Sequence, residues 1–295
     1  MYHKFYGFTE SPFNMTPNSR FFYESAKHTE ALSTLVYAIQ ERKGFVVITG
    51  EIGSGKTTVC RALLNQLDAK TQSALITNTY ISGRDLLASV LEELDVEYVP
   101  GSKARLLGQL NQYLIEQLRH DNNVVLIIDE AQNLKPSVLE EVRMLSNLET
   151  EEEKLIQIIF LGQPELKRKL ALPKLEQLRQ RVAVYFHLTP LTEQETKDYI
   201  VYRLKVASQS DRQYFTEDAV NIVYKFSKGV PRLINQICDS ALLSGFIYES
   251  LIVNEKTMNE VVRESPIIQI TSELKNKKES IEQFDDEFSM EKFNE

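Results

Sequence analysis

A run of nine residues early in the sequence has the composition and spacing of a phosphate-binding loop. In order, its members are Gly50, Glu51, Ile52, Gly53, Ser54, Gly55, Lys56, Thr57 and Thr58. The glycines let the backbone curl so that successive N–H groups point at phosphate oxygens, and a following helix adds its positive dipole end. In such a loop the lysine reaches the β- and γ-phosphates and the threonine hydroxyl ligates Mg²⁺. We therefore expect the nine residues to bind MgATP, with Lys56 on the phosphates and Thr57 on the metal.

Two adjacent carboxylates follow a second apolar run. Asp129 and Glu130 come directly after residues 124–128, whose β-branched composition is typical of a strand buried on both faces. Ligands bind at the carboxyl ends of strands in open α/β sheets. We expect Asp129 to hold Mg²⁺ through water, and Glu130 to orient the attacking water and accept its proton. The alternative for such a pair is a helix cap, but the phosphate loop earlier in the sequence favours the metal and base roles.

The elements around these motifs alternate between strand and helix. Short apolar runs of strand character lie at residues 45–49, 73–77, 124–128, 156–161 and 182–186. Helical spacing of apolar residues occurs around residues 27–42, 57–68, 84–94, 103–119 and 137–148. This alternation predicts an α/β fold, a parallel five-stranded sheet with helices on both faces.

After Pro190 the strand signals stop. Helical patterns then follow at residues 193–208, 216–227, 232–245 and 255–263, which predict a small all-helical domain, called the lid below. The predicted organisation is therefore an irregular N-terminal segment packed on the core at 1–26, a P-loop ATPase domain at 27–188, the lid at 189–265, and an acidic, disordered tail at 266–295.

The predicted tail is strongly acidic. Residues 271–295 contain four Lys and eight Asp or Glu with little apolar periodicity, as expected of a solvated terminus. Phe284, Phe288 and Phe293 interrupt it at irregular spacing. They leave open a second interpretation, in which the tail is a docking motif for a partner.

Composition excludes several classes of protein. The net charge of −8 argues against a globally basic nucleic-acid-binding protein. The longest apolar runs are about five residues, far short of the roughly 20 that a membrane-spanning helix needs. The first residues lack the apolar stretch of a signal peptide, so we expect no membrane span and a cytoplasmic location.

The two cysteines, Cys60 and Cys238, lack His or Cys neighbours at metal-ligand spacing. We expect them to be small buried side chains.

Several dispersed stretches resemble the AAA+ superfamily and, within it, the ExeA/GspA (MshM-like) family of secretion and pilus-biogenesis ATPases. They lie at residues 5–8, 11–13, 50–58, 129–134, 145–150, 161–166, 177–181 and 229–235, so that the resemblance covers about residues 1–265. The resemblance implies ATP and Mg²⁺ as cofactors and a nucleotide-dependent homo-oligomer, as a ring or a filament. It also implies an ATP hydrolase that drives assembly or operation of a bacterial secretion or pilus system.

The same resemblance implies the partners. They would be an envelope secretion or pilus component or a partner ATPase. Longer family members continue into a transmembrane helix and a peptidoglycan-binding extension. Because this sequence does not, we expect it to be peripheral at the inner membrane only through a partner.

The resemblance also assigns roles to individual residues. It makes Gln163, just past the predicted fourth strand, the sensor 1 residue, although Gln163 could instead cap the helix that begins near Pro164. It makes Arg179 or Arg181 the arginine finger that reaches a neighbouring subunit's ATP; we favour Arg181, with a surface salt bridge as the alternative for either. It makes Arg232 the nucleotide-contacting sensor 2 arginine, and the preceding proline suits the first turn of a helix.

The family pattern also suggests an adenine pocket between residues 23–28 and the lid. Within that segment, His28 could equally be a surface residue at the start of a helix. The base contacts are therefore left open.

Two other functions remain to be weighed. A DNA-binding AAA+ regulator of transposition or DNA remodelling would use basic residues such as Lys167, Arg168, Lys169 and Lys174. The overall charge opposes this function, and a solvated helix face is the simpler interpretation of these side chains.

A module that binds nucleotide without turnover is the third possibility. Glu130 argues against it, because a pure binder has no use for a second, water-facing carboxylate.

Overall fold

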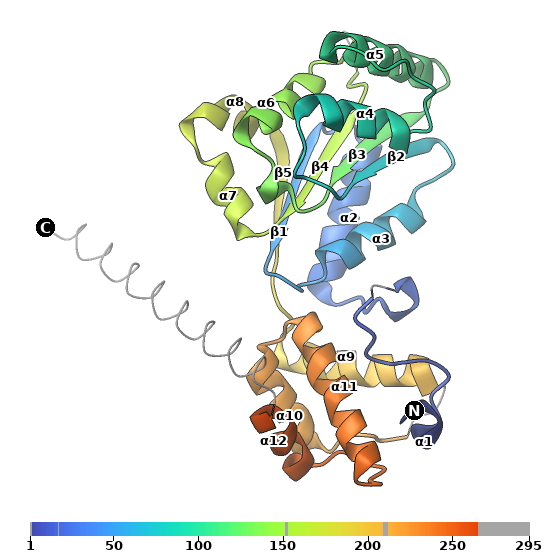
Figure 1. Ribbon diagram of the computed structural model, residues 1–295, viewed down its shortest axis with the longest axis vertical. Coiled ribbons are helices and arrows are strands. Elements are labelled where there is room, and N and C mark those ends of the chain that lie inside the picture. Colours follow the sequence, from blue (N-terminus) through green and yellow to red (C-terminus); the bar gives the residue numbers. More distant parts are fainter. Residues whose placement is uncertain (1, 17, 151–152, 209–211, 265–295) are drawn as a thin grey trace, which may run out of the picture. The chain divides into compact units, whose positions relative to one another are not determined.

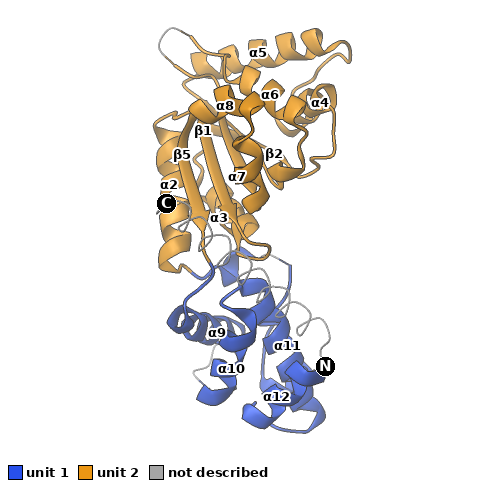
Figure 2. Cartoon of the chain, turned by 90° about the vertical axis from the view of Figure 1, so that its left-hand side faces the viewer, with its two compact units in different colours: residues 1–23, 190–295 blue, residues 24–189 orange. Residues whose placement is uncertain are grey.

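A computed structural model describes residues 2–16, 18–150, 153–208 and 212–264 (Figure 1). The predicted acidic tail, with Phe284, Phe288 and Phe293, lies outside the described residues. The chain divides into two compact units, one formed by residues 24–189 and the other by residues 1–23 together with 190–295 (Figure 2). We call them the P-loop unit and the helical unit.

The P-loop unit is built on one five-stranded sheet. Its strands are β1 (Phe45–Gly50), β2 (Thr71–Ile76), β3 (Asn123–Ile128), β4 (Gln157–Gly162) and β5 (Val182–Leu188). Their order is β2-β3-β4-β1-β5, and all four neighbouring pairs are parallel. The predicted parallel five-stranded sheet is thereby confirmed. Because β3, β4 and β1 are parallel neighbours, their carboxyl ends lie along the same edge of the sheet.

Helices cover the sheet. They are α2 (Ala26–Gln40), α3 (Lys56–Gln66), α4 (Gly83–Glu93), α5 (Lys103–Arg119), α6 (Pro136–Leu145), α7 (Pro164–Leu170) and α8 (Glu176–Gln180), with short 3-10 turns η2 (Ala131–Asn133) and η3 (Pro173–Leu175). Phe45 and Val47 of β1 join an apolar core with residues of α4 to α8. The alternate residues Val46 and Ile48 are equally buried. A strand buried on both faces explains why β1 is a continuous apolar run.

The helical unit combines both ends of the described chain. It holds α1 (Tyr2–Tyr6), η1 (Ser19–Phe21), α9 (Glu193–Ser208), α10 (Glu217–Ser227), α11 (Pro231–Ile247) and α12 (Glu255–Glu264). Residues near the start of the chain form hydrogen bonds with residues that follow Pro190. The Tyr6 hydroxyl donates to the main-chain oxygen of Ser250 at 3.0 Å, and Thr9 Oγ1 donates to that of Ala207 at 2.7 Å. The sequence predicts that residues 1–26 pack on the core, and residues 1–23 belong to the same unit as α9 to α12.

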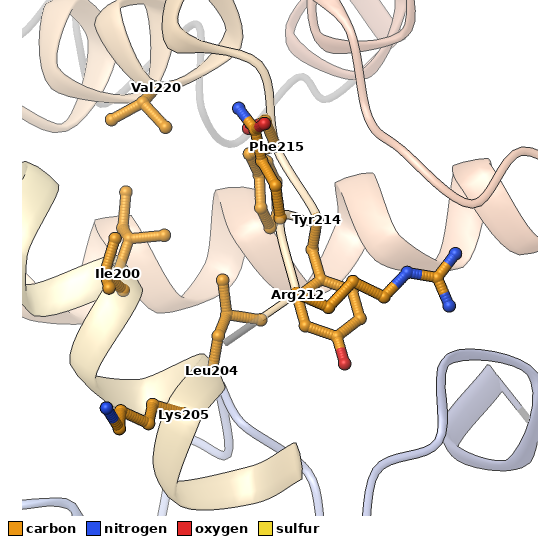
Figure 3. Close-up of a pocket in the computed structure, with 9 residues that line it drawn as sticks. Ile200, Leu204, Lys205, Arg212, Tyr214, Phe215 and Val220 are labelled. Atoms are coloured by element: carbon orange, nitrogen blue, oxygen red, sulfur yellow. The ribbon is translucent and has the colours of Figure 1, made fainter. Parts of the chain in front are cut away.

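A cavity of about 310 Å³ lies within the helical unit (Figure 3). It is bounded by α9, the segment before α10, and α10, and it is mainly apolar. Its lining residues are Ile200, Val201, Leu204, Lys205, Arg212, Gln213, Tyr214, Phe215 and Val220. No helix among the described residues has both the length and the apolar character to cross a bilayer.

Candidate nucleotide site

The phosphate loop lies between the end of β1 at Gly50 and the start of α3 at Lys56. Two of its glycines adopt left-handed backbone angles, with φ of +78° at Gly53 and +103° at Gly55. A Cβ atom on Gly55 would lie 2.6 Å from the Nε2 atom of His28, and one on Gly50 would lie 2.7 Å from Ser54 Oγ. Gly53 and Gly55 therefore supply the left-handed backbone angles of the loop, and at Gly50 and Gly55 a side chain would lack space.

The lysine of the loop is held inside it. Lys56 is only 5% exposed, and its ammonium donates to the main-chain oxygens of Gly50 at 2.8 Å and Glu51 at 3.0 Å. Burial lowers the pKa of Lys56, and the nearby carboxylates of Glu130 and Asp129 oppose this shift. The buried Ser54 hydroxyl has no hydrogen-bond partner among the described residues. A buried cation and an unpaired buried hydroxyl inside a glycine-rich turn are the donor set that phosphate oxygens fit.

The two predicted metal ligands lie side by side. Thr57, at the start of α3, donates its hydroxyl to Asp129 Oδ2 at 3.0 Å, and Asp129 is 6% exposed at the end of β3. Among the described residues, no cluster of three or more His, Cys, Asp or Glu could hold a metal alone. One hydroxyl and one carboxylate suit Mg²⁺, which keeps several waters and takes further oxygens from substrate phosphates.

Glu130 occupies a special backbone position next to this pair. It has a left-handed φ of +52°, and its N–H donates to the Asp129 side chain at 2.9 Å. Its carboxylate oxygen Oε2 accepts from Gln132 Nε2 at 2.5 Å and from Gln163 Nε2 at 2.9 Å, while the Thr79 hydroxyl donates to its main-chain oxygen at 3.2 Å. The carboxylate is therefore held by side chains that follow β3 and β4, and the main chain of Glu130 by one that follows β2.

His28 also reaches the phosphate loop, from helix α2. It is 5% exposed and is not the surface residue that the sequence allowed. Its Nε2 lies 3.0 Å from the main-chain oxygen of Ser54, and its Nδ1 lies 2.7 Å from Ser25 Oγ. Since a main-chain oxygen can only accept, Nε2 carries a proton, and in the neutral ring Nδ1 then accepts from the serine hydroxyl. Ser25 is also the N-cap of α2, so the spacing Ser-x-x-His at a helix start was the available sequence signal.

Comparisons with known proteins agree with this geometry. A family model described as "AAA domain" matches residues 39–170. The chain is 44% identical over 247 residues to General secretion pathway protein A of Aeromonas hydrophila, an alignment that covers 83% of this chain and 45% of the relative. The chain therefore carries an AAA domain and resembles the ExeA/GspA family over most of its length. It spans less than half the length of that relative.

Solved structures show the same AAA+ fold at low sequence identity. Aeropyrum pernix ORC2 in its ADP form matches with a TM-score of 0.66 and 12% identity, covering 88% of this chain and 73% of that one. Cdc6p of Pyrobaculum aerophilum matches with a TM-score of 0.65 and 17% identity, covering 84% and 71%. The Thermotoga maritima RuvB branch-migration motor matches with a TM-score of 0.57 and 17% identity, covering 85% and 72%.

The structure distinguishes the two roles considered for the AAA+ sensor 1 candidate, Gln163. Gln163 occupies the N-cap position of α7 but makes no side-chain capping bond. Its amide instead reaches Glu130. The side chain of Gln163 is therefore directed at Glu130 and not at the helix end, and the sensor 1 role stays a prediction.

The two arginine-finger candidates make different local contacts. Arg179 Nη1 donates to the main-chain oxygens of Leu170 and Ala171, each at 3.3 Å, and so caps the end of α7. Arg181 Nη1 donates to Ser146 Oγ at 2.6 Å. Neither arginine bonds to the phosphate loop, so a finger role requires a second subunit and stays a prediction.

Arg232, the sensor 2 candidate, lies in the helical unit. It is the second residue of α11, which begins at Pro231 as the sequence predicted. The preceding Gly229 has a φ of +74°, and a Cβ there would lie 1.8 Å from the main-chain oxygen of Leu191, so the approach to α11 requires glycine. A contact of Arg232 with nucleotide stays a prediction.

Sequence reasoning missed Gln132, Thr79 and the role of Lys169. The Lys169 ammonium donates to the main-chain oxygens of Gln132 and of Leu134, the latter at 2.8 Å, and burial lowers its pKa. Lys169 thus supports η2 and does not belong to the solvated helix face that the sequence suggested.

Proposed function

We propose that this chain binds MgATP in the phosphate loop and hydrolyses it, with Glu130 as the general base. The observation that carries the proposal is the arrangement of Glu130 beside the Thr57–Asp129 pair, with its carboxylate close enough to the buried Lys56 to act on its charge. A site that only bound nucleotide would have no need of a second carboxylate held in place by two amides. Electrostatic stabilisation and positioning supply nearly all of the catalysis in phosphoryl transfer.

Each residue has one task in the proposed reaction. Lys56 and the loop N–H groups would bind the β- and γ-phosphates, and Thr57 and Asp129 would hold Mg²⁺, which neutralises phosphate charge when bound. Glu130 accepts a proton from water as the water oxygen bonds to the γ-phosphorus. The bond between that phosphorus and the bridging oxygen breaks, leaving ADP and inorganic phosphate. Gln163, as sensor 1, would register the γ-phosphate through its contact with Glu130.

The biological setting is proposed from the family. We infer that hydrolysis drives assembly or operation of a bacterial secretion or pilus system, because the 44% identical relative is named for general secretion. The chain would act as a homo-oligomer, as AAA+ proteins commonly do, on an envelope component or partner ATPase. We place it in the cytoplasm, peripheral at the inner membrane through that partner.

The test is steady-state ATP hydrolysis by the full chain and three variants. Lys56→Ala is expected to lose nucleotide binding, and Glu130→Gln to retain ATP but hydrolyse it at least about tenfold more slowly, since a catalytic base contributes roughly 100-fold or more. Arg84→Ala, an exposed arginine on α4 that bonds to the main-chain oxygen of Gly101, is the control. Unchanged turnover in Glu130→Gln would exclude the base assignment.

The same assay separates the second candidate function. Duplex DNA is added at low salt, because salt weakens phosphate contacts steeply. Turnover that is indifferent to DNA supports the secretion or pilus function. Strong stimulation would favour a DNA-binding regulator of transposition or DNA remodelling, whose exposed basic side chains would include Lys167 and Lys174.

A further inference from the structure

Gln132 makes three hydrogen bonds that the proposed reaction does not explain. Its Nε2 donates to Glu130 Oε2 at 2.5 Å, and its Oε1 accepts from the main-chain N–H of Gln163 at 3.0 Å. Its own main-chain oxygen accepts from the Lys169 ammonium. Gln132 is half-buried on the 3-10 turn η2. Hydrogen bonds hold both its main-chain oxygen and its side-chain amide, and the amide nitrogen donates to the proposed base.

The orientation of this amide is determined by its partners. A main-chain N–H can only donate, so the oxygen of the Gln132 amide must face Gln163 and its NH₂ group must face the Glu130 carboxylate. Space for this arrangement depends on Gly162, where a Cβ would lie 3.0 Å from Gln132 Oε1 and 2.8 Å from a Leu166 methyl group. The end of β4 is thus shaped to admit the amide.

Two amides hold the same oxygen of Glu130. Gln132 and Gln163 both donate to Oε2, so neither of these bonds uses Oε1. Hydrogen bonds to a charged acceptor are about twice as strong as neutral ones, and two of them from different elements remove the rotational freedom of the carboxylate. Oε2 is therefore fixed in place, which leaves Oε1 as the oxygen that would accept a proton from water.

We propose that Gln132 is a positioning residue for hydrolysis: together with Gln163 it fixes Glu130 Oε2 so that Oε1 faces the attacking water. The inference rests on the proposed function. It goes further by naming a residue that touches neither nucleotide nor metal and acts through the base. Because Gln132 contacts Glu130 and not the phosphate loop, it controls the rate of hydrolysis and leaves nucleotide affinity unchanged.

Two variants test this role. Gln132→Glu is nearly isosteric and keeps an acceptor for the Gln163 N–H, but it replaces the donor to Glu130 by a second carboxylate. Gln132→Ala removes both contacts. Each is expected to lower kcat about tenfold or more, the scale of misplacing a catalytic base, with KM for ATP and Kd for a fluorescent ATP analogue changed less than about twofold. Gln112→Glu makes the same charge change on an exposed face of α5 and is expected to match the wild type.

A double variant distinguishes positioning from a structural role. If Gln132 acts through Glu130, then adding Gln132→Ala to Glu130→Gln costs no further activity in single-turnover assays, because residues that act as a unit are not additive. Losses that add, or a weakened Kd for the analogue, would overturn the inference, as would normal kcat in both single variants. Thermal melting checks that each variant is folded.

The outcomes for the two proposals differ. If the wild type turns over ATP, Glu130→Gln stops it, and the Gln132 variants behave as wild type, only the positioning role is lost. If Glu130→Gln hydrolyses ATP normally, the base assignment and the positioning role fall together.

Discussion

The Nε2 atom of His28 lies 3.0 Å from the main-chain oxygen of Ser54, which ties helix α2 to the phosphate loop. The bond is buried at both ends, since His28 is 5% and Ser54 0% exposed. A buried acceptor that loses its partner costs about 1–3 kcal/mol. The shape of the loop therefore depends on a residue that precedes it by 26 positions.

His28→Ala is expected to weaken nucleotide affinity about tenfold, because the main-chain oxygen of Ser54 loses its donor and the loop loses a fixed wall. The measurement is the Kd of a fluorescent ATP analogue. His120→Ala, at the exposed C-cap of α5 where His120 bonds to Glu116, should bind normally. Equal affinity in the two variants would show that α2 does not support the loop.

Gly55→Ala is expected to abolish nucleotide binding. The new Cβ would lie 2.6 Å from His28 Nε2 on a backbone with φ of +103°, a conformation that alanine adopts only with strain. Gly108→Ala is the matched control, because Gly108 lies within helix α5 and a Cβ there meets nothing within 4 Å. The control should raise Tm slightly, since alanine is favoured over glycine in a helix by about 0.5–1 kcal/mol.

Arg181→Ala is expected to slow hydrolysis at least about tenfold without weakening binding of the analogue, if Arg181 is the arginine finger. Arg179→Ala should have a smaller effect, because the Arg179 guanidinium is used at the end of α7. A mixture of Arg181→Ala and Glu130→Gln subunits should regain activity, since some interfaces then contain both an intact base and an intact finger. Failure to regain activity would argue that Arg181 does not act across a subunit boundary.

The two cysteines are expected to be unreactive in the native chain. Burial raises the pKa of the Cys60 thiol to about 12 and that of Cys238 well above its usual range. Because the thiolate is the reactive form, the small thiolate population at pH 8 and the lack of access both oppose reaction. Ellman's reagent should detect almost no thiol in the native chain and two after unfolding in guanidinium. Rapid reaction of one native thiol would show that α3 or α11 opens locally.

The sheet, and the positions of the main candidate site residues at its edge, were predictable because their signals are local. The run from Phe45 to Thr57 contains a buried strand, a glycine-rich turn and a helix start in order. Asp129 and Glu130 likewise end an apolar strand. The predicted second strand was displaced by one or two residues from the observed β2, as is common for element ends.

The contacts around Glu130 could not be predicted in the same way. Gln132 and Gln163 meet only because β3 and β4 are neighbours in the sheet, and their separation of 31 positions leaves no periodic signal. The His28 contact depends similarly on α2 returning to the loop. Glutamine and histidine are common polar residues, and only the fold shows that these three are directed at the site.

The composition of the helical unit has a consequence for synthesis. The P-loop unit is continuous in the chain, whereas the helical unit needs residues 1–23 and residues 190 onward. Phe8, Phe13 and Phe21 are buried in it, so on a ribosome these rings emerge long before the helices that cover them. At about 5–20 residues per second, the wait for α12 is roughly 10–50 s. During that time the nascent segment that contains Phe8, Phe13 and Phe21 exposes these rings, and we expect it to bind chaperones and to promote aggregation if synthesis stalls.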